Sequence, residues 1–163
     1  MYFIVGLGNP GEVYARTRHN TGRMAEDYIS ESGKVEAKFI FPDTFMNKSG
    51  LAVAKVIKNK KTAERLIVIY DDMDLPLGTL KVSFNRSAGG HKGVESIIHA
   101  LKTETFIRIR IGIGKKANVE KHILGKFKKS EIEILKKVFK RAQGAVETII
   151  THGLDRAMTE FNS

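Results

Sequence analysis

The sequence predicts an α/β fold: one domain over residues 1–163, with a mixed, mostly parallel central sheet flanked by helices. Strand-like apolar runs alternate along the chain with segments of helical periodicity, which is typical of such sheets. Residues 66–70 form a continuous apolar run, the pattern of a strand covered on both faces. The sequence contains no internal repeat, low-complexity segment or linker, so we expect a single domain.

The first half of the chain predicts two strands and two helices. Residues 2–7 are apolar and end in a Gly-Asn-Pro-Gly turn, which indicates a buried strand. A helix is expected from Asn20 or Thr21, either of which is a suitable N-cap, to Gly33. Residues 34–41 predict a short strand that Pro42 ends. A second helix is expected after Ser49, with these positions facing inward: Leu51, Val53, Ala54, Val56 and Ile57.

The second half continues the alternation. The central strand at 66–70 leads into the acidic segment Asp-Asp-Met-Asp. Residues 80–84 predict a strand, and the glycine-rich loop 88–93 precedes a helix over 94–101. Residues 106–113 alternate isoleucine with arginine and glycine, as a further strand does.

The last third is predicted to be helical. Ser130 and Glu133 fit a capping box, and apolar residues follow them at helical spacing. A short final helix is expected over 154–161, after the break at Gly153.

Charge and cysteine content narrow the functional classes. Lys and Arg number 28 against 18 Asp and Glu, so the formal net charge is +10, which favours phosphate-rich partners such as nucleic acids. The lack of cysteine excludes disulfides, thiolate metal sites and a cysteine nucleophile. No stretch approaches the roughly 20 apolar residues of a membrane span, and the N-terminus has no signal-peptide pattern. We therefore expect a cytoplasmic protein with no membrane partner.

Polar side chains are expected to converge at one edge of the sheet. In open α/β sheets, ligands bind at the carboxyl ends of the strands. Asn9 follows the first strand, Asp71 ends the central strand, and the loop 89–93 follows another. His19 precedes a helix and Asn47 lies between a strand and a helix, so both can reach the same crevice.

This set of side chains suits hydrolysis by an activated water. An imidazole can deprotonate water while a carboxylate on its other nitrogen fixes the tautomer. Carboxamide N–H groups can hold a developing oxyanion. An ester is easier to cleave than an amide, so a covalent nucleophile is not required.

Two other kinds of site fit the sequence less well. Residues 6–11 match G-x-G-x-x-G, but eight residues separate the last glycine from the first expected helix, so a dinucleotide pyrophosphate lacks its helix N-terminus. The acids at 71, 72 and 74 lack the spacing of a calcium loop, and no histidine pair has zinc spacing. We therefore expect neither a cofactor nor a metal.

Seven segments together resemble the bacterial peptidyl-tRNA hydrolase family, in the order of that family and over nearly the whole chain. They are residues 5–11 (VGLGNPG), 17–22 (TRHNTG) with Tyr14 before them, 44–50 (TFMNKSG) after Pro42, 71–78 (DDMDLPLG), 89–93 (GGHKG), 108–114 (RIRIGIG) and 124–127 (LGKF). The resemblance implies hydrolysis of the ester between peptide and tRNA, on a fold like that of the family.

The resemblance also implies roles for the catalytic residues. His19 would be the general base and Asp71 the acid that holds it. Asn9 would contact the peptide side of the substrate and help to reject aminoacyl-tRNA with a free amino group. Asn47 would bind near the scissile ester.

Further positions would bind the substrate. The crevice would be lined by Phe45 and Met46 beside Asn47, and Tyr14 would contact the tRNA end. The loop residues His91 and Lys92 would belong to the same binding set. Two basic positions would grip the 5′-phosphate of tRNA, Lys81 and Arg110.

The chain departs from the family pattern at three places. Many members have Asn where this chain has Lys92, and a lysine cannot accept a hydrogen bond. Ser83 stands where a second basic residue is common. The segment between Gly33 and Phe45 is shorter than usual. None of these changes touches His19 or Asp71, so activity is expected to be retained.

The main alternative is a catalytically silent tRNA- or RNA-binding protein on the same fold, consistent with the charge of +10 and with Lys92. Such a protein would bind tRNA in a salt-dependent way without turnover. A nucleotide-dependent enzyme is the third alternative and rests on the first glycine loop alone. A monomer is expected, because no heptad pattern is present.

Overall fold

The structure, a computed structural model, describes residues 1–162. Its elements in chain order are β1 Phe3–Gly6, η1 Glu12–Tyr14, η2 Arg18–Asn20, α1 Thr21–Ser32, β2 Lys38–Ile40, η3 Met46–Lys48, α2 Ser49–Ala54, α3 Lys60–Ala63, β3 Leu66–Asp72, β4 Leu80–Phe84, α4 Lys92–Leu101, β5 Ile107–Gly112, α5 Val119–Leu124, α6 Lys129–His152 and α7 Leu154–Phe161, where η marks a short 3₁₀ helix.

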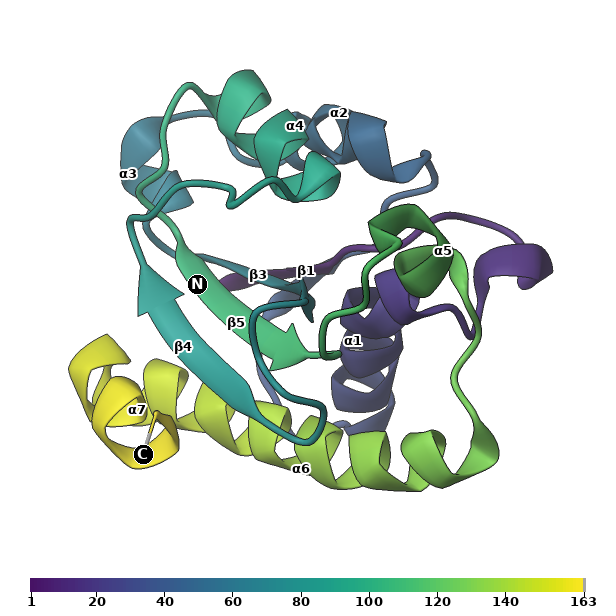
Figure 1. The fold of residues 1–163 in the computed structure, drawn as a ribbon. Coiled ribbons are helices and arrows are strands. Elements are labelled where there is room, and N and C mark those ends of the chain that lie inside the picture. The colour runs from purple at the N-terminus through teal and green to yellow at the C-terminus, as the bar shows by residue number, and fades with distance from the viewer. Residues whose placement is uncertain (163) are drawn as a thin grey trace.

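The five strands form one sheet in the order β2-β1-β3-β5-β4 (Figure 1). All neighbouring strands are parallel except β4 and β5, which are antiparallel. The predicted mixed, mostly parallel sheet is thus confirmed. Strand β3 lies at its centre, and its apolar residues are buried because helices cover both faces.

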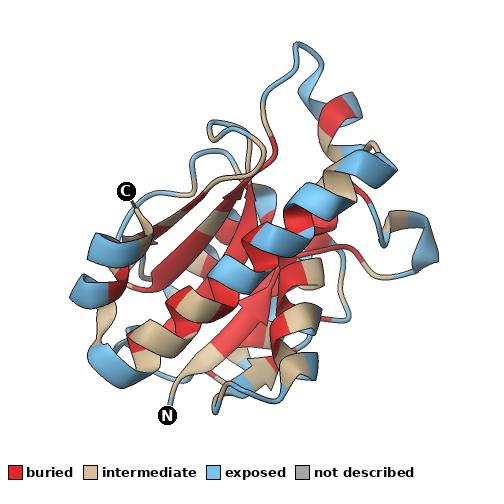
Figure 2. Cartoon of the chain, turned by 90° about the horizontal axis from the view of Figure 1, so that it is seen from below, coloured by how far each residue is buried: buried red, intermediate tan, exposed pale blue. Residues whose placement is uncertain are grey.

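Alternate residues of the strands serve two separate cores. Ile67 and Ile69 of β3 face the core shared with α1, α6 and α7. Val68 and Tyr70 face the opposite core, which contains apolar residues of α2 and α4. Figure 2 shows the long helix α6 buried along the side that faces the sheet and exposed on its other side.

Three local predictions differ from the structure. Strand β2 is shorter than the predicted 34–41. Leu51, predicted to face inward, is 57% exposed, because α2 is only six residues long and packs through Val53. The predicted capping box of Ser130 and Glu133 is wrong: α6 begins at Lys129, and the Glu131 carboxylate accepts from the backbone N–H of Lys128 at 2.7 Å.

The antiparallel strand β4 lies at one edge of the sheet, where the side chain of Asn162 extends the pairing. The backbone N–H of Val82 donates to Asn162 Oδ1 at 2.7 Å, and Asn162 Nδ2 donates to the carbonyl of Val82 at 2.8 Å. Helix α7 is thereby fastened to β4. Among the described residues, no helix is both long and apolar enough to cross a bilayer.

Candidate active site

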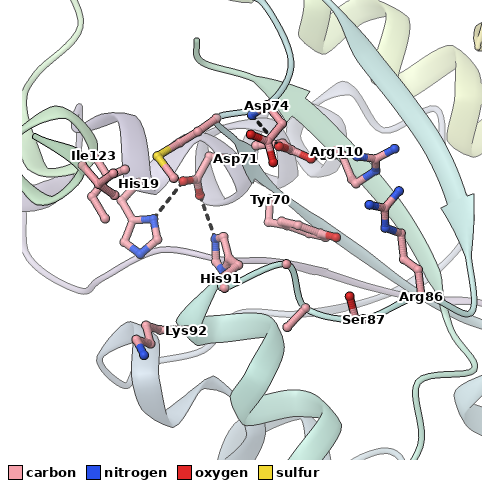
Figure 3. Close-up of a pocket in the computed structure, with 16 residues that line it drawn as sticks. His19, Tyr70, Asp71, Asp74, Arg86, Ser87, His91, Lys92, Arg110 and Ile123 are labelled. Carbon is pink, nitrogen blue, oxygen red and sulfur yellow. Dashed lines mark hydrogen bonds and ion pairs between the residues drawn. The ribbon is translucent and has the colours of Figure 1, made fainter. Parts of the chain in front are cut away.

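His19 and Asp71 meet at the carboxyl edge of the sheet. Asp71 lies near the end of β3 and is 4% exposed, and His19 lies in η2 directly before α1 and is 7% exposed. Nδ1 of His19 and Oδ2 of Asp71 are 2.9 Å apart (Figure 3). The predicted base and its carboxylate are therefore in direct contact, out of bulk water.

Two glycines allow this contact by letting α1 lie directly on the sheet. A Cβ on Gly22 of α1 would come within 2.1 Å of the carbonyl oxygen of Ile69 in β3. A Cβ on Gly6 of β1 would come within 2.2 Å of the carbonyl oxygen of Gly22. Any side chain at either position would push α1 away and draw His19 off Asp71.

A second imidazole binds the other oxygen of Asp71. Nε2 of His91 lies 2.9 Å from Asp71 Oδ1. Nδ1 of His91 accepts the backbone N–H groups of Gly93 and Val94 at 3.1 and 3.3 Å, so this ring is the N-cap of α4. Because Nδ1 is an acceptor, Nε2 carries the proton and donates it to Asp71.

These contacts keep Asp71 ionised. Burial by itself would raise the pKa of the Asp71 carboxyl, but the electrostatic attraction and hydrogen bonds of His91 and His19 hold that pKa well below its usual range. An ionised carboxylate is only an acceptor, so Nδ1–H of His19 must donate to it. Nε2 of His19 is then left with a free lone pair, as a general base requires.

A pocket opens beside His19 and extends along the loops after β3 and β4. Of the predicted site residues it is lined by His19, Asp71, His91, Lys92 and Arg110. Lys92 stands at its mouth: its side chain is 71% exposed, and its only close carboxylate among the described residues is Glu95 at 3.7 Å. Asn9, Tyr14, Phe45, Met46, Asn47 and Lys81 do not line this pocket.

Asn9 nevertheless adjoins the His19 segment. Its backbone N–H donates to the side-chain oxygen of Asn20 at 2.9 Å, and Asn20 Nδ2 donates back to the Asn9 carbonyl at 2.9 Å. Its own Oδ1 accepts the backbone N–H of Met46 at 2.7 Å. Asn9 therefore joins three segments, and Nδ2 is the end of its amide that can face a ligand.

The segment Phe45 to Asn47 contributes one buried and two exposed side chains. Met46 is buried, with its sulfur under Gly93 at the start of α4. Asn47 is exposed, and Phe45 is exposed with its ring edge-on to Tyr14 at 6.1 Å between centroids. These side chains lie on the Asn9 side of His19, away from the pocket that contains Arg110.

The two predicted phosphate-binding cations are cross-strand neighbours. Lys81 of β4 pairs directly with Arg110 of β5, so both side chains leave the same face of the sheet. Arg110 forms an ion pair with Asp72 at 2.8 Å and donates to Ser83 Oγ at 3.1 Å. The ammonium of Lys81 donates to the backbone carbonyl of Asn162. Each cation thus already has an oxygen partner that an anion must share or displace.

The cluster of His19, Asp71 and His91 brings together three groups of the kind that bind metals, with their ligand atoms within 4.8 Å of one another. The hydrogen bonds oppose a metal there. A metal needs a lone pair on Nε2 of His91, but that nitrogen must carry a proton while Nδ1 caps α4. The three side chains are therefore better suited to share two protons in hydrogen bonds than to bind a metal cation.

Sequence reasoning missed three contributors. Asn20 was considered only as a helix cap, yet its side chain binds Asn9. Tyr70 belongs to the core, as the apolar run predicts, and it also lines the pocket with its ring 5.0 Å from that of His91. Asp72, which holds Arg110, was grouped with the other acids. The sequence signal for Tyr70 and Asp72 is that both directly flank Asp71 in the chain.

Fold and site together define a class: an α/β protein with a buried histidine–carboxylate pair at the carboxyl edge of a single sheet. Comparison with known proteins identifies one family within this class. A family model described as peptidyl-tRNA hydrolase matches residues 3–39 and 32–163. The chain belongs to the peptidyl-tRNA hydrolase family, as the sequence motifs predicted.

Individual relatives agree. A peptidyl-tRNA hydrolase from Thermodesulfovibrio yellowstonii is 42% identical over 185 residues, covering 99% of each chain. One from Sulfurihydrogenibium is 39% identical over 181 residues, covering 98% of this chain and 96% of the relative. The crystal structure of peptidyl-tRNA hydrolase from Acinetobacter baumannii superposes with a TM-score of 0.91 at 28% identity, covering 100% of this chain and 95% of that one. The two parts of the family match overlap at residues 32–39, at the start of the segment that the sequence motifs predict to be shorter than usual.

Proposed function

We propose that this protein hydrolyses the ester bond between the peptide and the tRNA of peptidyl-tRNA, with His19 as general base and no metal. The observation that carries the proposal is the buried contact between His19 Nδ1 and Asp71 Oδ2, which leaves Nε2 without a partner among residues 1–162, beside an open pocket. Membership of the peptidyl-tRNA hydrolase family supports the choice of substrate.

The reaction follows from that geometry. Nε2 of His19 takes a proton from a water molecule as the water oxygen attacks the ester carbonyl carbon. Asp71 stabilises the imidazolium that forms, since its carboxylate already accepts from Nδ1. When the tetrahedral intermediate collapses, the ribose oxygen leaves and takes the proton back from His19. The products are a free peptide carboxylate and a free tRNA.

Carboxamides are proposed to hold the peptide side. Asn9 offers its Nδ2 donors because its oxygen is occupied by Met46 N–H. Asn47 is exposed and can donate to the developing oxyanion or to a peptide carbonyl. The exposed ring of Phe45 and the half-buried ring of Tyr14 form an aromatic pair next to Asn47. An N-blocked substrate presents an amide to this side, whereas an aminoacyl-tRNA presents a charged ammonium.

The tRNA side is proposed to lie along the pocket and the open face of β4 and β5. Arg110 and Lys81 would bind the 5′-phosphate, and Lys92 would contact a phosphate near the 3′ end. Such contacts set affinity and register without taking part in the chemistry. All these residues come from one chain, which supports a monomer, and the substrate supports a cytoplasmic site of action.

The decisive experiment compares N-acetyl-aminoacyl-tRNA with unblocked aminoacyl-tRNA in the presence of chelator, using the parent and His19→Ala. We expect the parent to cleave only the blocked substrate, and the variant to lose about 10²–10⁴ in kcat. Retention of the parental rate by His19→Ala would falsify the assignment of the base. Salt-dependent tRNA binding without any cleavage would instead support the silent RNA-binding protein.

A further inference from the structure

A buried arginine without an acidic partner lies behind the active site. Arg108 of β5 is fully buried, and no ion pair among the described residues gives it a carboxylate. Its guanidinium instead donates to four backbone carbonyls: Phe106 at 3.3 Å, Ser87 at 3.3 Å, Glu104 at 3.0 Å and Arg86. Its Cζ also lies 4.0 Å from the ring centroid of Phe106.

The burial of the Arg108 cation lowers the free energy of unfolding, so stability alone does not account for it. A buried cation loses its hydration, and replacing buried ionic groups by apolar ones of similar volume is often neutral or stabilising. Burial lowers the pKa of the Arg108 guanidinium, yet an arginine stays charged at neutral pH. The hydrogen bonds of the guanidinium join two segments of the chain, because its acceptors belong to the loop after β4 and to the turn before β5.

The loop after β4 carries active-site residues. Arg86 and Ser87, whose carbonyls Arg108 binds, line the pocket together with Gly89, Gly90 and His91. Gly89 and Gly90 both have positive φ, a conformation that glycine adopts without strain, so the path of this loop depends on them. Arg108 fixes the start of the loop, and the bond from His91 to Asp71 fixes its end.

Tyr70 provides a second connection. Burial raises the pKa of the Tyr70 hydroxyl and the nearby Arg108 guanidinium lowers it, so the two groups lie close together, and the Tyr70 ring meets the ring of His91 at 5.0 Å and 65°. In Figure 3, Tyr70 lies between His91 and Arg86. Tyr70 therefore connects the surroundings of Arg108 to the aromatic surface against which the His91 ring packs.

We propose that Arg108 is a positioning residue for the hydrolytic step: it fixes the loop at 86–91 and Tyr70, and so holds His91 against Asp71 and Asp71 against His19. The inference rests on the proposed function, because it assigns a role within that reaction. Arg108 touches neither the reacting atoms nor the pocket, so it acts only through Tyr70 and His91.

The cation has an electrostatic effect in the same direction. An unpaired positive charge buried in a protein favours the ionised form of a nearby carboxyl and disfavours a second cation beside it. When Arg108 is removed, the charge is lost and His91 is also less firmly held as a donor to Asp71. Both effects leave the Asp71 carboxylate less stabilised, so the acidic limb of the pH–rate profile, which reports the coupled pair of Asp71 and His19, should move to higher pH.

Other groups around His19 are the same in every variant. Asp71 faces it from β3, and His91 and Lys92 face it from the start of α4. On α5, His122 binds the carbonyls of Ile113 and Gly114. On α1, Arg23 binds the carbonyl of Pro42 and Glu26 binds Gly6 N–H. Asp72, Arg110, Asp74 and Arg86 line the same pocket.

The experiment measures kcat and KM for N-acetyl-aminoacyl-tRNA from pH 5 to 9, together with thermal unfolding. Arg108→Met removes the charge and the hydrogen bonds, Arg108→Lys keeps the charge, and Tyr70→Phe removes only the hydroxyl. Arg65→Met, at an exposed arginine just before β3, is the control for loss of one positive charge.

For Arg108→Met we expect kcat to fall about 10- to 100-fold with KM within about twofold of the parent. The acidic limb should move up by about half to one pH unit, and by less in Arg108→Lys and Tyr70→Phe. Arg65→Met should match the parent. A loss of kcat with an unmoved acidic limb in the folded variants would mean that Arg108 is only structural and would overturn the inference.

If Arg108→Met does not fold, the Tyr70→Phe variant tests the inference instead, because it keeps the buried ring and the cation. An unchanged pH–rate profile in Tyr70→Phe would contradict the role of Arg108.

Two further outcomes separate this inference from the proposed function. If the parent itself does not cleave the blocked substrate, the proposed function fails. If the parent cleaves it and the variants behave like the parent, only the role of Arg108 fails.

Discussion

The backbone N–H of Met46 donates to the side-chain oxygen of Asn9 across 37 positions of sequence, at 2.7 Å. This one contact decides which end of the Asn9 amide meets a ligand. The oxygen is used inside the protein, so a substrate can meet only the two N–H donors of Nδ2. Asn9 is therefore suited to bind carbonyl oxygens of a peptide and unsuited to bind an ammonium.

Asn9→Asp tests this orientation with little change of shape. One carboxylate oxygen can still accept from Met46, but the donor is replaced by a negatively charged acceptor. We expect kcat/KM for N-acetyl-aminoacyl-tRNA to fall about 10- to 100-fold, as for an unpaired polar group in a binding site. Asn59→Asp, at the N-cap of α3, is the control and should have no effect. Equal activity of Asn9→Asp and the parent would contradict the assignment.

Asp71→Asn tests the tautomer of His19. An amide can donate to Nδ1 and so place the imidazole proton on Nε2, where the base needs its lone pair. The expected loss in kcat is about 10²–10⁴, with KM little changed. Steady-state kinetics at pH 7 and thermal unfolding check this; a variant as active as the parent would show that the carboxylate is dispensable.

His91→Asn separates the two functions of His91. Asn is itself a good N-cap, so α4 keeps its cap, whereas the proton donated to Asp71 is lost. The contacts of His91 help to hold the Asp71 pKa below its usual range, so their loss raises that pKa, and the acidic limb of the pH–rate profile, which reports the coupled pair of Asp71 and His19, should move to higher pH. His99→Asn, at an exposed position on the same helix, should leave the profile unchanged. A downward movement would refute the argument.

Arg110→Met tests the proposed phosphate contact. Loss of one phosphate contact should raise KM several-fold and leave kcat nearly constant, because the contact is made equally in ground and transition states. The slope of log affinity against log salt should become shallower by about 0.7–0.9. Arg65→Met should change neither quantity. An unchanged salt slope in Arg110→Met would show that Arg110 serves only to hold Asp72.

Glu26 predicts a pH-dependent stability. Its carboxyl is fully buried, accepts Gly6 N–H at 2.8 Å, and has a second oxygen that finds no partner in the described part of the chain. Burial raises its pKa from 4.5 to about 9. Because the folded state holds this proton more tightly than the unfolded state, the stability from this group is complete below about pH 4.5 and is lost as the pH rises through about 9.

Glu26→Gln, a neutral isostere, should remove that dependence. At pH 8 we expect the variant to be more stable than the parent by roughly 2–4 kcal/mol, at about 1.4 kcal/mol for each pKa unit, and the difference should shrink toward pH 5. Urea unfolding at the two pH values measures it. Glu133→Gln, at an exposed site, should show no such trend; an equal offset at both pH values would contradict a buried proton.

The sheet was predictable because its signals are local. The apolar run of β3 needs two covered faces, and the helices between the strands supply them. Prediction failed where a choice depended on the helix ends: Leu51 has the right spacing to face inward, but α2 is too short to bury it. Similarly, Glu131 rather than Glu133 caps α6, because the helix begins at Lys129.

The site was predictable in its members more than in their contacts. The motifs around His19, Asp71 and His91 identified these residues, but not that both imidazoles donate to one carboxylate. That sharing depends on pairing between segments far apart in the sequence. Arg108 illustrates the same limit: in an alternating strand an arginine suggests a solvent-facing position, yet its carbonyl acceptors in the next loop allow complete burial.

The amide of Asn162 on the edge of β4 has a consequence for how these molecules behave at high concentration. The edge strand of a sheet has unpaired backbone N–H and C=O groups that can pair with a strand of another molecule. Such edge-to-edge pairing is a common first step of aggregation. Asn162 occupies both backbone groups of Val82, in the middle of that edge, with a side chain that cannot propagate a ladder. The side chain of Asn162 therefore disfavours self-association of the protein through the edge of β4.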